Sequence, residues 1–227
     1  MTLYKSLLNW ALPNTCIACK QNLIPPAKLC LTCRDDFKTI SFNHSANLLH
    51  RADIGRLFNK PSFDSVFALC WYEDYSAMWL KQVKYHGAQH VCIALQQLLK
   101  KQLRLARQYN NWVEPELCLP VPLHWFRYLR RGYNQSELIW QNLHLPLNTK
   151  VLKRTRYTQP QTNLLKSQRQ KNLKHAFSCS LNKTFKHVAI LDDTLTTGST
   201  VNEIAKLLKY NGVEYVSVWA VAIAPKK

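Results

Sequence analysis

Residues 188–200, with the sequence VAILDDTLTTGST, decide the fold of this 227-residue chain. Four apolar residues lead directly into two adjacent acids, Asp192 and Asp193, and a hydroxyl-rich turn follows. The pattern predicts a strand over 187–191, then the acids in a turn, then a helix over 199–212. This order is typical of a parallel α/β sheet, in which ligands bind beyond the carboxyl ends of the strands.

The turn has the chemistry of an anion site. The N-terminus of the following helix offers free N–H groups and a positive dipole end, which attract phosphate. Hydroxyls at Thr194, Thr196, Thr197 and Ser199 add donors, and Gly198 allows a close backbone approach. The turn has neither GxxxxGK[ST] nor GxGxxG, which excludes the two common nucleotide fingerprints.

The two acids would repel a phosphate, so we expect them to face hydroxyl groups, a metal ion or a sugar. A sugar phosphate fits, with its hydroxyls on the acids and its phosphate in the turn. The alternative is a hydroxyl-capped helix preceded by two solvated acids.

The rest of the chain continues the alternation of strands and helices. Apolar runs predict strands over 64–72, 116–123 and 213–224, and helical periodicity predicts helices over 76–87, 89–108 and 135–145. A short amphipathic helix is predicted over 2–11 and a basic loop over 124–134. Residues 152–177 are basic and polar and predict a mobile loop followed by a short helix.

Basic residues dominate, with 31 Lys+Arg against 13 Asp+Glu and a net charge of +18. Glu137 is the one acid between residues 117 and 191, where thirteen Lys and Arg occur. One interpretation is a solvated basic surface. The other is an anionic partner such as a phosphate ligand, a nucleic acid or both.

Four of the eight cysteines form the pattern Cys16-x2-Cys19-x10-Cys30-x2-Cys33. Two CxxC pairs supply four thiolates, which suit the tetrahedral preference of Zn²⁺. The alternatives are two disulfides or four buried thiols. A site of four thiolates leaves no open position, so we expect a structural zinc ion that keeps a small module folded.

No apolar run reaches the ~18–20 residues that span a bilayer, and the N-terminus lacks the features of a signal peptide. We therefore expect a cytoplasmic protein without membrane insertion, with reduced thiols. The chain divides into a four-cysteine module over 1–40, a linker or irregular segment over 41–62 and an α/β domain over 63–227.

These motifs also carry a family resemblance. VAILDDTLTTGST resembles the phosphoribosyl-pyrophosphate (PRPP) signature of type I phosphoribosyltransferases. Together with the four-cysteine module, LKQVKYHG, LPVPLHWFRYLRRGYNQSELI and VLKRTRYTQPQTNLLKSQRQKNLKHAF, it resembles the ComF (competence protein F) family. The motifs follow in order over nearly the whole chain. The resemblance implies a type I phosphoribosyltransferase fold, a mainly parallel sheet flanked by helices, with an N-terminal zinc finger.

The resemblance also assigns roles. Asp192 and Asp193 would hold the ribose hydroxyls, directly or with Mg²⁺, and would be the catalytic residues of a transferase. The 5-phosphate would be wrapped by Thr194, Leu195, Thr196, Thr197, Gly198 and Ser199. Arg131 is the best candidate for the pyrophosphate, with Arg127 and Arg130 beside it, and Lys84 is a second candidate. Residues 152–172 would be the loop that closes over the reaction centre.

ComF proteins are associated with natural transformation, in which single-stranded DNA enters the cytosol. Basic residues would neutralise its phosphates. The candidates are Arg127, Arg130, Lys153, Arg154, Arg156, Tyr157, Lys166, Arg169 and Lys171. Aromatic residues among them could stack on bases or could pack in the core; these are Trp125, Phe126, Tyr128, Tyr133 and Tyr157.

Two functional hypotheses follow. One is a DNA-uptake protein that binds PRPP and single-stranded DNA, with other DNA-uptake proteins as further candidate partners. The other is a PRPP-dependent transferase with an unidentified acceptor and no direct role with DNA. Whether the protein is an enzyme stays open at this point.

Overall fold

Four apolar segments pair into one parallel sheet. In strand order they are β1 (Ser65–Trp71), β6 (Tyr215–Ile223), β5 (His187–Leu195) and β2 (Leu117–Pro120). This computed structural model describes residues 14–155 and 176–225. Both outer strands, β1 and β2, come from the first half of the domain, and the two central strands come last in the sequence. The predicted α/β class with a parallel sheet is confirmed.

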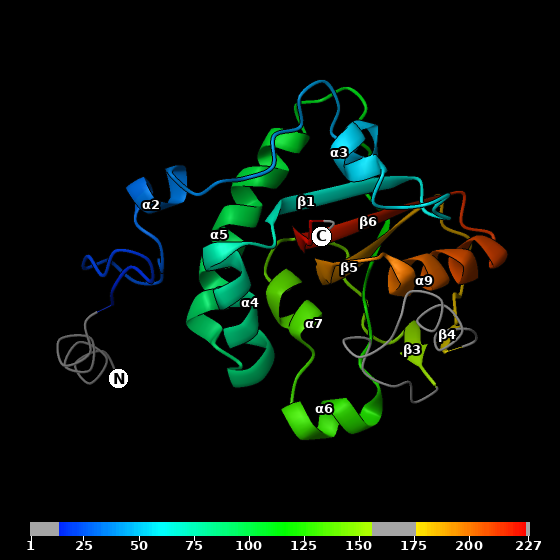
Figure 1. Cartoon of the computed structure of the whole chain (residues 1–227). Helices are drawn as coiled ribbons and strands as arrows, with labels where there is room; N and C mark the ends of the chain where they lie inside the picture. Colours follow the sequence, from blue (N-terminus) through cyan, green and yellow to red (C-terminus); the bar gives the residue numbers. More distant parts are fainter. Residues whose placement is uncertain (1–13, 156–175, 226–227) are drawn as a thin grey trace.

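Helices flank this sheet. Figure 1 shows α4 (Asp74–His86), α5 (Gln89–Ala106) and α7 (Gln135–Trp140) together on one side of the sheet and α9 (Ser199–Tyr210) on the other. Because both faces are covered, every residue of β6 after Tyr215 is buried. An aromatic cluster fills one face: the ring of Trp219 lies 5.4 Å from Phe67, 5.1 Å from Trp112 and 6.1 Å from Trp140.

One predicted loop is a helix. Residues 124–134 contain α6 (Trp125–Arg131), which ends at Gly132 in the left-handed conformation. The ring of His124 accepts a hydrogen bond from the Phe126 N–H and caps this helix. Histidine lies outside the residues that usually mark a helix start, so the helix has no cap that the sequence pattern identifies. The helix predicted over 135–145 also ends early, at Trp140.

The strand that carries the two acids is longer than predicted. β5 continues through Asp192 and Asp193 to Leu195, because β6 runs on beside it and pairs Ala220 with Asp192 and Ile223 with Leu195. The acids therefore lie within the end of a strand and not in a turn after it.

A second, two-stranded antiparallel sheet was not predicted. It pairs β3 (Leu152–Arg154) with β4 (Phe177–Cys179). The helix predicted over 2–11 and most of the loop predicted over 152–177 lie outside the described residues.

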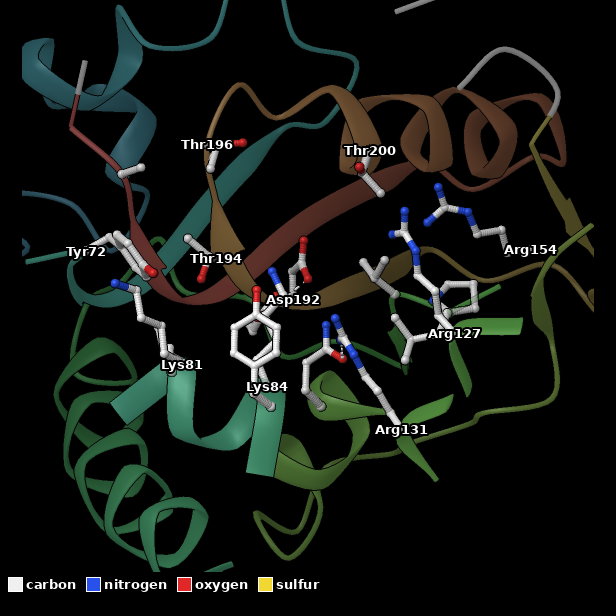
Figure 2. A pocket seen from close by; sticks show the side chains of 18 of the residues that line it. Tyr72, Lys81, Lys84, Arg127, Arg131, Arg154, Asp192, Thr194, Thr196 and Thr200 are labelled. Atoms are coloured by element: carbon white, nitrogen blue, oxygen red, sulfur yellow. Dashed lines mark hydrogen bonds between the residues drawn. The ribbon is translucent and has the colours of Figure 1, made fainter. Parts of the chain in front are cut away.

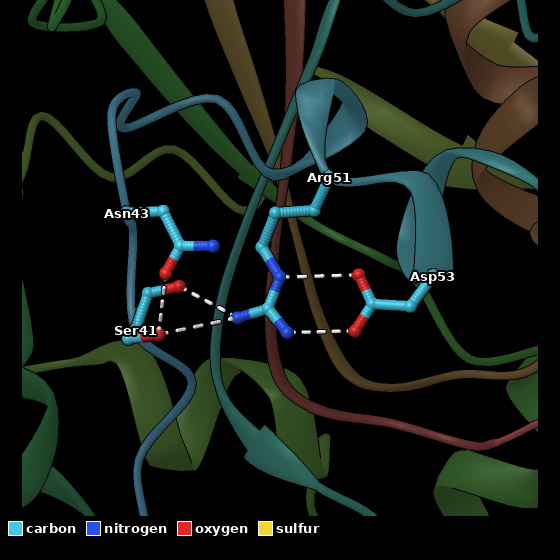
Figure 3. A network of polar contacts seen from close by, with 4 residues as sticks. All are labelled: Ser41, Asn43, Arg51 and Asp53. Atoms are coloured by element: carbon cyan, nitrogen blue, oxygen red, sulfur yellow. Dashed lines mark hydrogen bonds and ion pairs between the residues drawn. The ribbon is translucent and has the colours of Figure 1, made fainter.

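The segment over 41–62 contains a 3-10 helix, η1 (Leu48–His50), and the short helix α3 (Ala52–Gly55). Phe42, Leu48 and Ile54 are buried in the same apolar core as the sheet. Arg51 fixes the outside of this segment: its guanidinium donates to both carboxylate oxygens of Asp53, at 3.1 and 2.6 Å, and to the Ser41 carbonyl at 2.7 Å (Figure 3).

The four-cysteine segment contains α2 (Leu31–Asp35) and contacts the helices of the main domain. The Gln97 side chain of α5 accepts hydrogen bonds from the backbone N–H groups of Lys28 and Leu29. Phe37 stacks on Trp79 of α4 with ring centroids 5.6 Å apart. Within the described ranges, no helix is long and apolar enough to cross a membrane.

Candidate functional site

A cleft of about 850 Å³ opens at the carboxyl edge of the sheet. Residues at or just beyond the ends of all four strands line it, including Tyr72, Val121, Asp192 and Ala224. Six basic side chains and two carboxylates share this cleft, and Figure 2 shows Arg131 directed toward the region of Asp192 and Arg127 directed toward Thr200. The charges are therefore divided, with a pair of acids at the floor and cations around it.

Burial and hydrogen bonds define the surroundings of Asp192. Asp192 is deep in the cleft, and burial raises the pKa of its carboxyl well above the usual value, with the adjacent Asp193 charge raising it further. Its Oδ1 accepts hydrogen bonds from the Ser136 hydroxyl at 3.3 Å and from the Asp193 N–H at 2.9 Å, which favour the charged form. Two carboxylates held side by side attract a cation or a hydroxyl-rich ligand.

Helix α7 holds the end of β5 in place. Besides the Ser136 contact, the indole N–H of Trp140 donates to the Asp192 carbonyl at 3.0 Å. One end of α7 thus orients the carboxylate and the other end anchors its backbone. Trp140 is buried in the aromatic cluster, so the floor of the cleft is tied to the core.

The cationic residues come from three elements. Lys81 and Lys84 lie on α4, three residues apart on one helix face, and Arg127, Arg130 and Arg131 lie on α6. Arg154 comes from β3, where its guanidinium lies 5.4 Å from the centroid of the Phe177 ring. Burial lowers the pKa of Arg154 to about 10, and the charge of Arg127 contributes, so Arg154 keeps its charge at neutral pH.

The stretch over 131–136 connects these elements. Arg131 donates to the Gln135 side chain at 2.8 Å. The Tyr133 hydroxyl donates to the Val83 carbonyl at 2.6 Å and accepts from the Gly87 N–H at 2.7 Å, at the end of α4.

Asn134 caps α7 by accepting from the Ser136 N–H, and its amide donates to the Val121 carbonyl beyond β2. The cleft walls are therefore joined through one short segment.

The hydroxyl-rich turn is divided between cleft and core. Thr194, Thr196 and Thr200 line the cleft. The Thr197 and Ser199 hydroxyls lie 2.7 Å apart and bond to each other.

The other two residues of the turn face the core. The Leu195 side chain is buried, so only its backbone can meet a ligand. Gly198 has φ +69°, and a Cβ placed there would lie 2.8 Å from the Phe58 ring.

The cleft brings together nine of the residues that the sequence singled out: Asp192, Asp193, Thr194, Thr196, Arg131, Lys84, Arg127, Arg130 and Arg154. The last three of these were predicted as DNA contacts. Lys153 is exposed on β3 and is not among the lining residues. The remaining DNA candidates, Arg156, Tyr157, Lys166, Arg169 and Lys171, lie outside the described residues.

Sequence reasoning missed Tyr72, Lys81, Gln135 and Thr200. Lys81 had a signal, because it precedes Lys84 by one helical turn and must share its face. Tyr72 also had one, since it directly follows β1 and the ends of parallel strands meet at one edge.

The four cysteines form a separate cluster in the N-terminal segment. Their Sγ atoms all lie within 4.8 Å of one another, and those of Cys19 and Cys30 are 3.8 Å apart. Four thiolates at a zinc bond length of ~2.3 Å in a tetrahedron have sulfur atoms ~3.8 Å apart. All four are free thiols, so the cluster fits a single tetrahedral metal ion such as zinc.

The thiols of the cluster differ in how readily they ionise: a hydrogen bond with Cys30 raises the pKa of Cys33, whereas the pKa of Cys16 is lowered. Burial acts to raise the pKa of the Cys16 thiol, but N–H groups of Cys19, Cys30 and Ala18 outweigh it and lower this pKa to about 6. A thiol that ionises near neutral pH suits a metal ligand.

Three curated proteins are informative relatives. The chain is 35% identical over 221 residues to competence protein F of Haemophilus influenzae, covering 92% of this chain and 96% of that protein. It is 36% identical over 170 residues to DNA utilization protein YhgH of Escherichia coli O157:H7, and 35% identical to that of Salmonella typhi. Each of these two alignments covers 73% of this chain and 75% of the relative. No protein-family model matches the sequence.

Proposed function

The chain belongs to the ComF family, and on that premise we propose that it is a DNA-uptake protein that binds Mg²⁺–PRPP in the cleft and single-stranded DNA through its basic residues. The names of the relatives, competence protein F and DNA utilization protein, support the role in DNA uptake. The proposed setting is the cytosol, where incoming single strands are handled.

The single observation that carries the PRPP proposal is the division of charge in the cleft. PRPP has ribose hydroxyls between a 5-phosphate at one end and a pyrophosphate at the other. The paired carboxylates of Asp192 and Asp193 suit the hydroxyls, while Thr194, Thr196 and Thr200 lie near the N-terminus of α9, which favours the 5-phosphate. The cations of α4 and α6 suit the pyrophosphate.

Magnesium fits the same donor set. Mg²⁺ is usually bound through one or two carboxylates together with substrate phosphates, and a divalent cation relieves the repulsion from Asp193 that, after burial, raises the pKa of Asp192. Bound Mg²⁺ would neutralise charge on the pyrophosphate. We propose Asp192 and Asp193 as the residues that hold it, directly or through the ribose hydroxyls.

Transfer from PRPP is the second candidate function. It needs a positioned donor, stabilisation of the departing pyrophosphate and exclusion of water, and no nucleophilic side chain. Arg131 and Lys84 would stabilise the leaving group, and the acids would orient the ribose. The cleft volume of about 850 Å³ lies near the top of the range for small-molecule sites, ~300–1,000 Å³, which leaves room for an acceptor.

The four-cysteine cluster is proposed to hold a structural zinc ion. Cys16, Cys19, Cys30 and Cys33 would be its four ligands, which leaves no open coordination position for catalysis. Its role would be to keep the segment that contacts Gln97 and Trp79 folded.

Isothermal titration calorimetry with Mg²⁺ and PRPP tests the central proposal. Saturable binding that disappears in Asp192→Asn/Asp193→Asn would support it, and absence of binding to the wild-type protein would refute it.

A gel shift with labelled single strands at increasing salt tests the proposed DNA binding. Binding should fall steeply with salt, because phosphate contacts release counterions. Pyrophosphate release in the presence of candidate acceptors would distinguish the transferase from a protein that only holds PRPP.

A further inference from the structure

Helix α6 has an unusual division of its surface. At about 100° per residue, Trp125, Phe126, Tyr128 and Leu129 fall on one continuous face. Arg127, Arg130 and Arg131 occupy the opposite face. All three arginines line the cleft, and the apolar residues do not.

The apolar face is turned toward solvent. Trp125 is 62% exposed and Leu129 71%, and Phe126 and Tyr128 are about half exposed. No residue of α6 is buried. A surface helix normally turns its apolar stripe to the core, so α6 has the opposite orientation. An exposed aromatic face of this kind marks an interaction site.

The charged residues beside the apolar face of α6 indicate which partner this face binds. Each border of the apolar face meets an arginine: Tyr128 adjoins Arg131, and Phe126 adjoins Arg130, which is itself exposed. A second copy docking through this face would bring like charges together. A single-stranded nucleic acid has both complements, bases that stack on aromatic rings and phosphates that pair with arginines.

We propose that α6 contacts two ligands, one on each face. Its apolar face stacks the bases of a single strand, and its arginine face binds the phosphates next to those bases. This inference rests on the proposed function, because the same arginines are the candidates for the pyrophosphate of PRPP. The two ligands therefore compete for the arginine face, and PRPP bound in the cleft lowers the affinity for the single strand.

The size of the helix sets the extent of the contact. Seven residues at ~1.5 Å each make a helix about 10 Å long, enough for two or three stacked bases. The strand then crosses the mouth of the cleft at Arg130, while Arg127 and Arg131 lie deeper. Arg130 is thus the residue most directly shared between the two ligands.

The first test compares two oligonucleotides and needs no variant. Wild-type protein is titrated by fluorescence anisotropy with labelled oligo-dT of about 15 nucleotides and with an abasic strand of equal length. Both strands have the same phosphates. We expect the abasic strand to bind about tenfold more weakly or worse, because it offers nothing to stack. Equal affinity for the two strands would overturn the base-stacking face.

The second test removes the apolar face. Trp125→Ala/Phe126→Ala is compared with Tyr210→Ala, which truncates a 90% exposed aromatic at the end of α9. We expect oligo-dT affinity to fall about tenfold in the double variant and to stay within twofold in the control. PRPP affinity, measured by calorimetry, should be unchanged in both, which also shows that the double variant is folded.

The third test addresses competition. Oligo-dT at about ten times its Kd should raise the apparent Kd of PRPP about elevenfold, by mass action. An unchanged or lower Kd would overturn the competition. If the wild-type protein bound no single strand at low salt, the DNA half of the proposed function would fail. If the wild-type protein and Trp125→Ala/Phe126→Ala bound oligo-dT with equal affinity, only this inference would fail. The apolar face would then be assigned to a protein partner.

Discussion

The hydroxyl of Tyr133 accepts a hydrogen bond from the Gly87 N–H at 2.7 Å, across the junction between the two cationic walls of the cleft. The same hydroxyl donates to the Val83 carbonyl at 2.6 Å. Gly87 ends α4 in the left-handed conformation, and a Cβ there would lie 3.0 Å from the Tyr133 ring. One phenol thus closes the end of the helix that bears Lys84 and fixes its distance from Arg131.

Tyr133→Phe should weaken PRPP binding although Tyr133 is not a predicted ligand of PRPP. Two hydrogen bonds are lost, which costs about 1–2 kcal/mol of stability, and Lys84 is no longer held relative to Arg131. We expect a several-fold rise in the Kd of PRPP measured by calorimetry. Tyr210→Phe is the matched control, since that side chain is 90% exposed. Unchanged PRPP affinity in Tyr133→Phe would show that the walls are positioned by other contacts.

Asp192→Asn should abolish PRPP binding and stabilise the protein at neutral pH. Asn keeps an oxygen that can accept from Ser136 and from the Asp193 N–H, and it removes one of two adjacent negative charges. We expect the melting temperature to rise by a few degrees, since about 1 kcal/mol corresponds to ~2–4 °C at this size.

The sign of the pH dependence follows from the raised pKa of Asp192. The folded protein binds this proton more tightly than the unfolded chain, so the group stabilises the fold at low pH and loses that effect as pH rises through its folded pKa. The stabilisation by Asp192→Asn should therefore shrink as pH falls, in thermal melts across this range. PRPP binding with Mg²⁺ should weaken over the same acidic range in the wild-type protein, because the carboxylate must be ionised. A stabilisation independent of pH would contradict the assignment.

Gly198→Ala should be more damaging than Gly212→Ala. Both glycines have positive φ, +69° and +85°, so both substitutions introduce a strained residue at a cost of about 1–2 kcal/mol. Only at Gly198 does the new Cβ meet a neighbour, the Phe58 ring at 2.8 Å, whereas nothing lies within 4 Å at Gly212. We expect a larger fall in melting temperature for Gly198→Ala, and weaker PRPP binding as the turn shifts. Equal melting temperatures would show that the Phe58 ring moves aside without loss of stability.

Removal of the metal should expose four thiols. One zinc ion per chain is expected by elemental analysis, and a strong chelator should make Cys16, Cys19, Cys30 and Cys33 reactive to a thiol reagent. Cys70, Cys92 and Cys118 are buried and serve as the internal control. A chain that contains no metal, or whose thiols react equally before and after chelation, would refute the proposed zinc site.

Much of the site could be predicted because its residues are close in sequence. Asp192, Asp193 and the threonines follow one apolar run, and Lys84 and Arg131 lie in short motifs. Arg154 joins the cleft only through the pairing of β3 with β4, which depends on a contact between residues far apart in sequence. The length of β5 was likewise set by its neighbour β6, since pairing carries it past the acids to Leu195.

Helix α6 was missed for a different physical reason. Its apolar residues face outward, so the segment has no apolar stripe that packs on the core, and its cap is a histidine. The charges of Arg127, Arg130 and Arg131 were visible, but their shared orientation toward the cleft depends on the helical conformation of the segment.

The strand order β1-β6-β5-β2 has a consequence for how the protein is made. β1 is translated early, yet among the described residues it pairs with β6 alone, about 150 residues later. Until β6 is synthesised, β1 is an apolar strand without this partner, and such unpaired strands are prone to aggregation. The cleft is complete only when β6 has paired with both β1 and β5. We therefore expect a nascent chain to bind its ligand only after β6 has been synthesised.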